Sequence, residues 1–113
     1  MDCIFCKIAQ GEIPSDIVYE NDSVMAFRDL TPQAPHHILI IPRKHIATLN
    51  DFNVEDAVIF GRMGLAAKHI ADTLGVDQQG YRVVVNCNEY GGQTVFHTHM
   101  HFLAGRNFTW PPG

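Results

Sequence analysis

The chain has 113 residues, of which 46% are hydrophobic, and a formal net charge of −4 with its histidines neutral. This length suits one domain with a single modest core. The basic residues form no cluster, which argues against tight binding of long nucleic acid. No stretch approaches the ~18 apolar residues of a membrane span, and the start of the sequence lacks a signal-peptide pattern. We therefore expect a cytoplasmic protein with reduced thiols.

The first part of the chain is predicted to form a short helix followed by three strands. Asp2 is the expected N-cap of a helix over residues 3–10, and Gly11 should end it. Three runs rich in β-branched or apolar residues predict strands: residues 17–20, 24–27 and 37–41. The first two should form a hairpin that turns at Asn21 and Asp22. The third is predominantly apolar, as expected of a buried central strand.

One long helix is predicted over residues 54–74, with Asn53 as its N-cap and Gly75 as its stop. Its apolar residues recur at helical spacing: Ile59, Met63, Ala66, Ile70 and Leu74. Two further strands are expected over residues 81–86 and 96–104, with a polar loop over 87–93 between them. Strands joined mostly by short loops, with one long and one short helix, predict an α+β fold with an antiparallel sheet.

Three alternating histidines stand out in the last predicted strand. His97, His99 and His101 are two residues apart, and side chains at that spacing on a strand lie on one face of the sheet. A helix would distribute them around its circumference. Seven histidines in 113 residues is already a high count, and three within five positions predicts shared chemistry. The alternative is a strand whose histidines simply face water.

A pair of cysteines, Cys3 and Cys6, has the CxxC spacing of zinc ligands. A redox role for such a pair is typical of a βαβ context, which the predicted elements do not provide. The alternative is two buried thiols in a small helix. The third cysteine, Cys87, has no partner in the sequence and is expected to bind nothing.

The segment from His97 to Leu103 resembles the signature of the histidine triad (HIT) superfamily, His-φ-His-φ-His-φ-φ, where φ is hydrophobic and Thr98 is the one departure. Further segments resemble the Hint branch of that superfamily: residues 27–37, 41–45, 81–86, 91–96 and 110–113. The resemblance covers nearly the whole chain. It implies a single HIT domain over residues 1–113, a five-stranded antiparallel sheet with two helices, and a homodimer with sheets joined across the interface.

The resemblance also implies an enzyme, a purine nucleoside phosphoramidase that cleaves the P–N bond of adenosine 5′-phosphoramidates and similar purine nucleotides. A covalent nucleotidyl-histidine intermediate is expected on His99, with one of its ring nitrogens held by the neighbouring backbone. A neutral imidazole suits this role because its pKa lies near ~6.5. His101 should donate to a phosphate oxygen, and His97 and His37 should support the pair. No catalytic cofactor is implied.

The nucleotide-binding residues follow from the same resemblance. Asp29 has two acceptor oxygens for the ribose hydroxyls, with Leu30 beside it against the sugar and base. From the residues alone, Asp29 would be a turn residue at a strand end. The other expected contacts, besides His99 and His101, are Asn86, Gly92, Gln93, Thr94 and Val95 near the phosphate, and Phe5, Ile8 and Phe27 near the base.

The tail over residues 105–113 is expected to reach the active site of the partner subunit, where it would bring Trp110. The alternative for this tryptophan is packing on its own subunit.

Some bacterial HIT proteins with an N-terminal CxxC bind zinc, and the matching histidines here are His45 and His97. With Cys3 and Cys6 they would form a closed Cys2His2 site, which is structural rather than catalytic. A His97 bound to zinc would not be free to take part in a proton relay. In that case His99 and His101 would carry the chemistry, with His37 in support.

Three other functions remain open at this stage. The first is a dinucleoside polyphosphate hydrolase, and the second is a regulatory module that binds a nucleotide or a protein without turnover. The third is a metal-dependent oxygenase in which the three histidines hold iron. That site would usually need a carboxylate on the same face, and the triad segment contains none. The sequence does not specify the leaving group or a preference between adenine and guanine.

Overall fold

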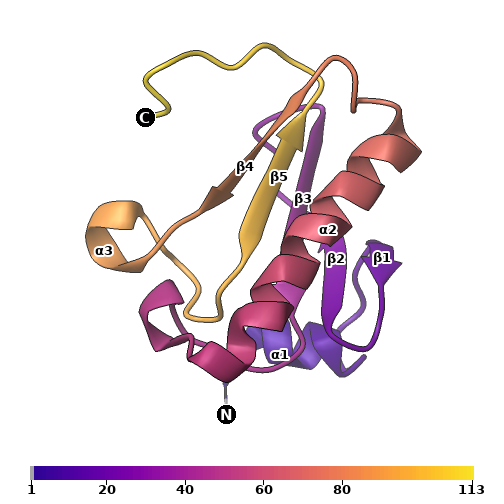
Figure 1. Cartoon of the computed structure of the whole chain (residues 1–113). Coiled ribbons are helices and arrows are strands. Elements are labelled where there is room, and N and C mark those ends of the chain that lie inside the picture. Colours follow the sequence, from indigo (N-terminus) through magenta and orange to yellow (C-terminus); the bar gives the residue numbers. More distant parts are fainter. Residues whose placement is uncertain (1) are drawn as a thin grey trace.

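A five-stranded antiparallel sheet with a long helix across one face organises residues 2–113, which the computed structural model describes (Figure 1). The strands lie in the order β1-β2-β3-β5-β4. They are β1 (Ile17–Glu20), β2 (Val24–Arg28), β3 (His36–Pro42), β4 (Tyr81–Val85) and β5 (Met100–Ala104). The helices are α1 (Ile4–Ala9), η1 (Leu49–Asp51), η2 (Val54–Asp56), α2 (Ala57–Leu74) and α3 (Asn88–Gly91), the two η elements being 3-10 helices. The predicted α+β class and antiparallel five-stranded sheet are confirmed.

The face of the sheet under α2 carries the larger part of the core. The strand side chains that pack there alternate along their strands: Val24 and Ala26, Ile38 and Ile40, and Met100, Phe102 and Ala104. Helix α2 contributes Met63, Ala66 and Ile70 from the predicted stripe, whereas Ile59 and Leu74 at its ends are only partly buried. The helix ends at Gly75, whose φ of 71° is left-handed, as predicted.

The opposite face of the sheet is covered by α1, and it carries the predicted chemistry. The residues that pack between them include Phe5, Ile8, Phe27, Leu39 and Ile41. Because strand side chains alternate between faces, His37 lies on this face with Leu39. His101 lies there too, since it is paired directly with Leu39 in the β3–β5 register. The sheet therefore has one predominantly apolar face, under α2, and one face that brings histidines under a short helix.

The predicted start of α1 is one residue early, and the predicted long helix begins at residue 54 with Asn53 as its N-cap, but as a 3-10 turn. Cys3, not Asp2, caps α1, because its Sγ accepts a hydrogen bond from the Cys6 backbone N–H at 3.3 Å. Helix α2 itself begins at Ala57, and residues 54–56 form the 3-10 turn, in which the Asp56 carboxylate accepts from the Asn53 N–H at 3.0 Å. A 3-10 turn is common at a helix N-terminus.

The predicted last strand is too long at its start, because β5 begins only at Met100. Residues 96–99 instead form an irregular segment held from elsewhere in the fold. Thr98, which is buried like the hydrophobic residue it replaces, donates its N–H to the Ile46 carbonyl at 2.7 Å. The predicted polar loop over 87–93 contains α3, an unpredicted helix that ends at Gly92 with φ of 83°.

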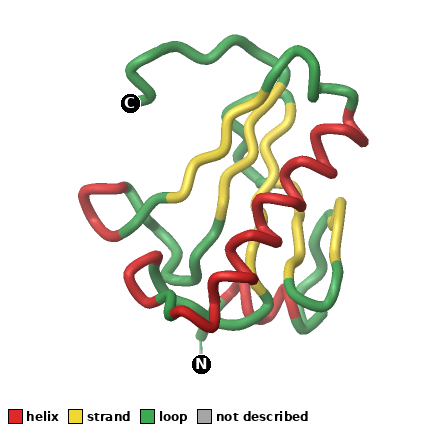
Figure 2. Tube along the Cα trace, viewed as in Figure 1, coloured by secondary structure: helices red, strands yellow, loops and turns green. Residues whose placement is uncertain are grey.

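The chain after β5 continues without helix or strand to its C-terminus, as Figure 2 shows in green. Strand β4 is an edge of the sheet, and it lies beside this tail through a hydrogen bond from Arg82 Nη2 to the Thr109 carbonyl at 2.9 Å. Among residues 2–113, no helix combines the length and apolar character needed to cross a membrane.

Candidate active site and metal-binding cluster

A cavity of about 320 Å³ opens between α1 and the histidine-bearing face of the sheet. Nine residues predicted to bind the nucleotide line it: Phe5, Ile8, Phe27, Asp29, Leu30, Thr94, Val95, His99 and His101. The volume falls at the lower end of the ~300–1,000 Å³ typical of small-molecule sites. Most of its wall is apolar, and its polar groups are few and clustered, which is the usual construction of a pocket for a ring-bearing ligand.

His99 presents one ring nitrogen to this cavity because the other is held by the backbone. Its Nδ1 lies 2.8 Å from the carbonyl oxygen of His97. A carbonyl only accepts hydrogen bonds, so Nδ1 carries the proton and Nε2 carries the lone pair. The His99 and Phe5 rings pack in a T-shaped arrangement, with centroids 5.1 Å apart. The ring is therefore fixed in both tautomer and orientation.

His101 and His37 are joined directly across β5 and β3. Nδ1 of His101 lies 2.9 Å from Nε2 of His37. Burial, followed by the neighbouring His99 and His37, lowers the pKa of His101 from 6.5 to about 4. Burial also lowers the pKa of His37, against the opposing effect of the Asp29 carboxylate. Both imidazoles are therefore neutral at neutral pH.

Asp29 serves at once as a turn residue and as a wall of the cavity. Its Oδ1 accepts hydrogen bonds from the Thr31 N–H at 2.8 Å and from the Thr31 hydroxyl at 3.1 Å. Its Oδ2 lies 3.5 Å from Nε2 of His37. The turn thus uses one oxygen and fixes the carboxylate at the rim, with the second oxygen available to a ligand that enters the cavity.

The sequence did not predict how close Asp29 lies to His37 and His101. One ligand-type atom from each of these residues lies within 4.8 Å of the others. They come from the end of β2 and from two paired strands, so their proximity depends on the sheet register. The carboxylate that an iron site would need is therefore present. However, Nε2 of His37 and Nδ1 of His101 are hydrogen-bonded to each other, so the lone pair of one of these two nitrogens is already occupied.

A second cluster lies beside the cavity, where the N-terminal end of α1 meets the loops after β3 and before β5. Its ligand atoms, two thiols and two ring nitrogens, come from Cys3, Cys6, His45 and His97 and all lie within 4.8 Å of one another. The Sγ of Cys3 is 3.3 Å from Nδ1 of His97, and the Sγ of Cys6 is 3.3 Å from Nδ1 of His45. These are the four residues predicted to bind zinc.

The surroundings of this cluster suit a cation. Nε2 of His97 donates to the Pro42 carbonyl at 2.7 Å, so the Nδ1 lone pair of the ring is directed at the cysteines. Burial, followed by the neighbouring Cys3, raises the pKa of the Cys6 thiol to about 11. A divalent cation would reverse that effect, because it favours thiolate ligands. Two thiols and two neutral imidazoles are the donor set of a structural zinc site.

Four residues predicted at the nucleotide site lie outside the cavity: Asn86, Gly92, Gln93 and Trp110. Asn86 lines a second cavity of about 250 Å³, which also borders His37 and His101. Gly92 ends α3, and Gln93 is buried, with its side chain bonded to the carbonyls of Ala47 and Val95 and to an N–H of α3. Gln93 therefore holds the loop that carries its neighbours.

The tryptophan of the tail, Trp110, is 81% exposed. Packing of Trp110 on its own subunit, the alternative considered for it, is therefore wrong.

His97 is also placed differently from the sequence expectation. It does not line the cavity with His99 and His101, because its ring is turned into the cysteine cluster. Only its carbonyl acts on the cavity, through His99. The sequence spacing predicted three rings on one face, whereas the irregular backbone before β5 separates the first from the other two.

The placement of His99 and His101 in the wall of one cavity agrees with the comparisons to known proteins. The HIT domain model matches residues 10–108. The purine nucleoside phosphoramidase of Escherichia coli K12 is 53% identical over 105 residues, or 93% of this chain and 88% of the relative. An uncharacterised HIT-like protein of Synechococcus elongatus is 51% identical over 112 residues, or 99% of this chain and 97% of the relative.

Solved structures agree as well. A HIT family hydrolase from Legionella pneumophila matches with a TM-score of 0.97 at 54% identity, covering 99% of this chain and all of that one. A histidine triad protein from Clostridium difficile matches with a TM-score of 0.94 at 50% identity, covering 96% of this chain and 95% of that one. The fold and its paired histidines define a small α+β hydrolase. The chain belongs to the HIT domain family, as its sequence resemblance indicated.

Proposed function

We propose that this protein is a purine nucleoside phosphoramidase that works through a covalent nucleotidyl-histidine. The observation that carries the proposal is the hydrogen bond from Nδ1 of His99 to the His97 carbonyl, which leaves the lone pair on Nε2 of a residue that lines the cavity. The E. coli relative with that name is 53% identical and aligns with 93% of the chain. The apolar wall of the cavity suits a nucleobase, and the Asp29 carboxylate suits vicinal ribose hydroxyls.

In the first step of this mechanism, Nε2 of His99 attacks phosphorus with its lone pair and the P–N bond breaks. The amine leaves with a proton that comes from solvent, and the Thr94 hydroxyl, which lines the cavity, is a candidate relay for it. His101 donates a hydrogen bond to a phosphate oxygen as negative charge develops there. In the second step, water displaces His99 from phosphorus and releases the nucleoside monophosphate. Splitting one displacement into two lowers the barrier to each.

Two of the alternatives, the dinucleoside polyphosphate hydrolase and the regulatory module, are separated from this function by the choice of substrate and by a single variant. We expect the wild-type protein to hydrolyse adenosine 5′-phosphoramidate faster than diadenosine polyphosphates. His99→Ala should lower kcat/KM by roughly 10⁴-fold or more, as removal of a nucleophile does elsewhere, while AMP binding measured by calorimetry is retained. Faster hydrolysis of the dinucleotide would favour the polyphosphate hydrolase. Nucleotide binding without turnover by the wild type would favour a regulatory module.

We also propose that Cys3, Cys6, His45 and His97 hold a structural zinc ion. The four donors converge, and the second ring nitrogen of His97 is already bonded to Pro42, which is typical of a metal-binding histidine. When bound, zinc would supply a tetrahedral cross-link between α1 and the loops around the sheet. The thiols must stay reduced for this role, which suits the cytoplasmic location expected from the sequence.

A homodimer is the third proposal, with β4 as the strand that pairs with its counterpart. Strand β4 is an edge of the sheet, and its Tyr81 and Val83 are 38% and 43% exposed. Unpaired edge strands readily add a second strand. The adjacent tail carries Trp110, whose exposure leaves it free to contact a partner. In such a dimer, residues 105–113 would extend the partner's active site, as the family resemblance implies.

A further inference from the structure

The loop between β2 and β3 reaches the catalytic histidines through one backbone amide. The N–H of Gln33 donates to Nδ1 of His37 at 3.0 Å. A backbone N–H only donates hydrogen bonds, so Nδ1 of His37 must be the acceptor. The proton of the neutral His37 ring therefore lies on Nε2. Nothing in the sequence pointed to Gln33, because the group that acts is its peptide and not its side chain.

The proton position on His37 determines the proton position on His101. Because Nε2 of His37 carries the proton, it donates to Nδ1 of His101, 2.9 Å away. The neutral His101 ring must then carry its own proton on Nε2, the nitrogen that His37 does not occupy. His101 lines the cavity with His99. The hydrogen bonds from Gln33 to His37 and from His37 to His101 thus leave a proton donor on Nε2 of His101, in the same cavity wall as His99, whose Nε2 carries a lone pair.

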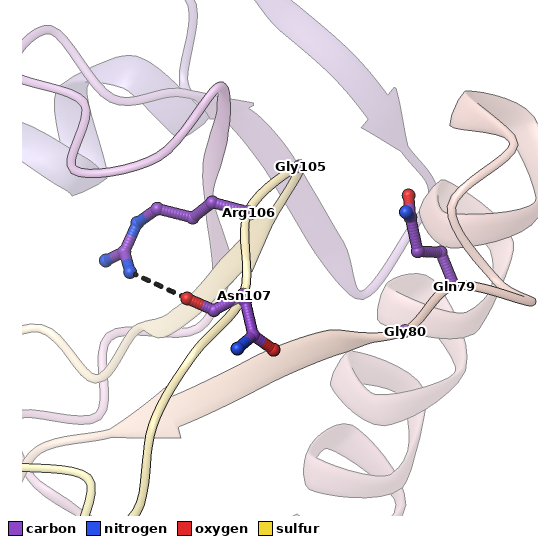
Figure 3. A pocket seen from close by; sticks show the side chains of 5 residues that line it. All are labelled: Gln79, Gly80, Gly105, Arg106 and Asn107. Carbon is purple, nitrogen blue, oxygen red and sulfur yellow. Dashed lines mark hydrogen bonds between the residues drawn. The ribbon is translucent and has the colours of Figure 1, made fainter.

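The backbone carbonyl of Gln33 is in turn bonded to the segment that follows β5. Nε of Arg106 donates to the Gln33 carbonyl at 3.0 Å. The guanidinium of Arg106 lies over the Phe108 ring, 4.2 Å from its centroid. Figure 3 shows the Arg106 side chain running away from Gln79, with its guanidinium also bonded to the Asn107 carbonyl. Its planar donors span two carbonyls, which a lysine could not reproduce in full.

We propose that the Gln33 peptide, clamped by Arg106, is a positioning group that fixes the tautomer of His101. Without the Gln33 N–H, the His37 ring could place its proton on Nδ1 and accept from His101 through Nε2. His101 would then carry its proton on Nδ1 and present a lone pair to the cavity, where the proposed reaction needs a donor. The catalytic consequence rests on the proposed function, whereas the tautomer assignment does not.

The direct test removes one backbone hydrogen. Gln33→Pro deletes the N–H and keeps the carbonyl that Arg106 binds, whereas the matched control Gln33→Ala keeps the N–H and loses only the side-chain bond to the Thr31 carbonyl. The ¹⁵N chemical shifts of the His101 ring, measured at pH 7 in the ligand-free protein, report its tautomer. We expect the Nε2–H form in the wild type and in Gln33→Ala, and a mixture with the Nδ1–H form in Gln33→Pro.

Turnover gives the second readout. Relative to Gln33→Ala, Gln33→Pro should lower kcat on adenosine 5′-phosphoramidate by roughly 10-fold with a smaller change in KM. The loss is modest because the correct tautomer stays partly populated, whereas full loss of a proton donor costs roughly 100-fold or more. If the wild type hydrolyses no phosphoramidate, the proposed function fails and the ring shifts still decide the tautomer proposal.

A second pair of variants covers the case in which Gln33→Pro does not fold. Arg106→Gln removes the clamp and should broaden the tautomer mixture of His101, and Arg106→Lys should partly restore the wild-type shifts by donating to the Gln33 carbonyl. An Nε2–H tautomer that persists unmixed in Gln33→Pro, or in Arg106→Gln where Gln33→Pro does not fold, would overturn the proposal. So would equal tautomer mixtures in Gln33→Pro and Gln33→Ala, because the side chain would then be responsible.

Discussion

The neighbouring residue His97 connects His99 to the cysteine cluster, because its side chain and its backbone carbonyl have different partners. The His97 side chain is directed at the cysteines, and the His97 carbonyl accepts the Nδ1 proton of His99. A cation in the cysteine cluster would therefore immobilise the residue that orients the proposed nucleophile. The proposed metal site and the proposed active site are thus linked by a single residue, although they share no side chain.

Asp29 gives a prediction about ribose recognition. Asp29→Asn removes the charged acceptor but keeps the side-chain size, so kcat/KM for the ribonucleotide should fall roughly 10-fold, as expected for loss of a charge-assisted hydrogen bond. The 2′-deoxy analogue should lose much less. Steady-state kinetics on both substrates measures the difference, with the exposed Asp22→Asn as control. A uniform loss on both substrates would contradict the assigned role.

The buried His101 gives a prediction about stability and pH. Its pKa is lowered from 6.5 to about 4 in the folded state, mainly by burial. Between these values the unfolded chain binds a proton that the folded chain does not, so the free energy of unfolding should fall as pH falls from 6.5 to 4. Urea denaturation across this range should show a weaker decline for His101→Gln than for the wild type. Identical slopes would contradict the assignment.

At the scale of elements, α1 is too short to be stable alone and depends on its contacts. Helices below ~12 residues are marginal in isolation, and α1 has six residues. Its Phe5 and Ile8 pack on the sheet, and its cap residue, Cys3, belongs to the metal-binding cluster. Since Phe5 and Ile8 also form a wall of the cavity, anything that loosens α1 should open this cavity.

Cys6→Ala tests the stabilising role of the cluster. Plasma mass spectrometry should find one zinc per wild-type chain and almost none in the variant, whose Tm should fall by about 10 °C, since a loss of ~2 kcal/mol is enough for that in a domain of this size. Cys87→Ala, which removes the cysteine outside the cluster, should keep both the zinc and the Tm. Zinc retained by Cys6→Ala would rule out the proposed ligand set.

At the scale of the whole molecule, the sequence correctly predicted the features that depend on local residue patterns. Runs of β-branched and apolar residues predicted the strands, and the stripe with Gly75 predicted most of α2. The CxxC spacing marked Cys3 and Cys6, and only the family resemblance added His45 and His97. What could not be predicted depends on contacts between distant segments. The break before β5, the turn of His97 into the cluster and the Gln33 amide on His37 all arise from tertiary packing.

The proposed dimer gives a prediction at the same scale. Val83→Lys places a charge on the exposed edge strand β4 and should convert a dimer to a monomer, with the change measured by light scattering after gel filtration. Ile17→Lys is a matched control, because Ile17 lies on the opposite edge strand and is 42% exposed against 43% for Val83. A wild type that is monomeric at micromolar concentration would contradict the dimer.

The central claim is that phosphorus becomes bonded to Nε2 of His99, and the most direct measurement is intact mass spectrometry after an acid-free quench. The wild-type protein, mixed briefly with a slowly hydrolysed adenosine phosphoramidate, should gain the mass of one adenylyl group, and peptide mapping should place it on His99. His99→Ala should gain none. An adduct on any other residue, or rapid turnover by a wild type that never carries an adduct, would contradict the account.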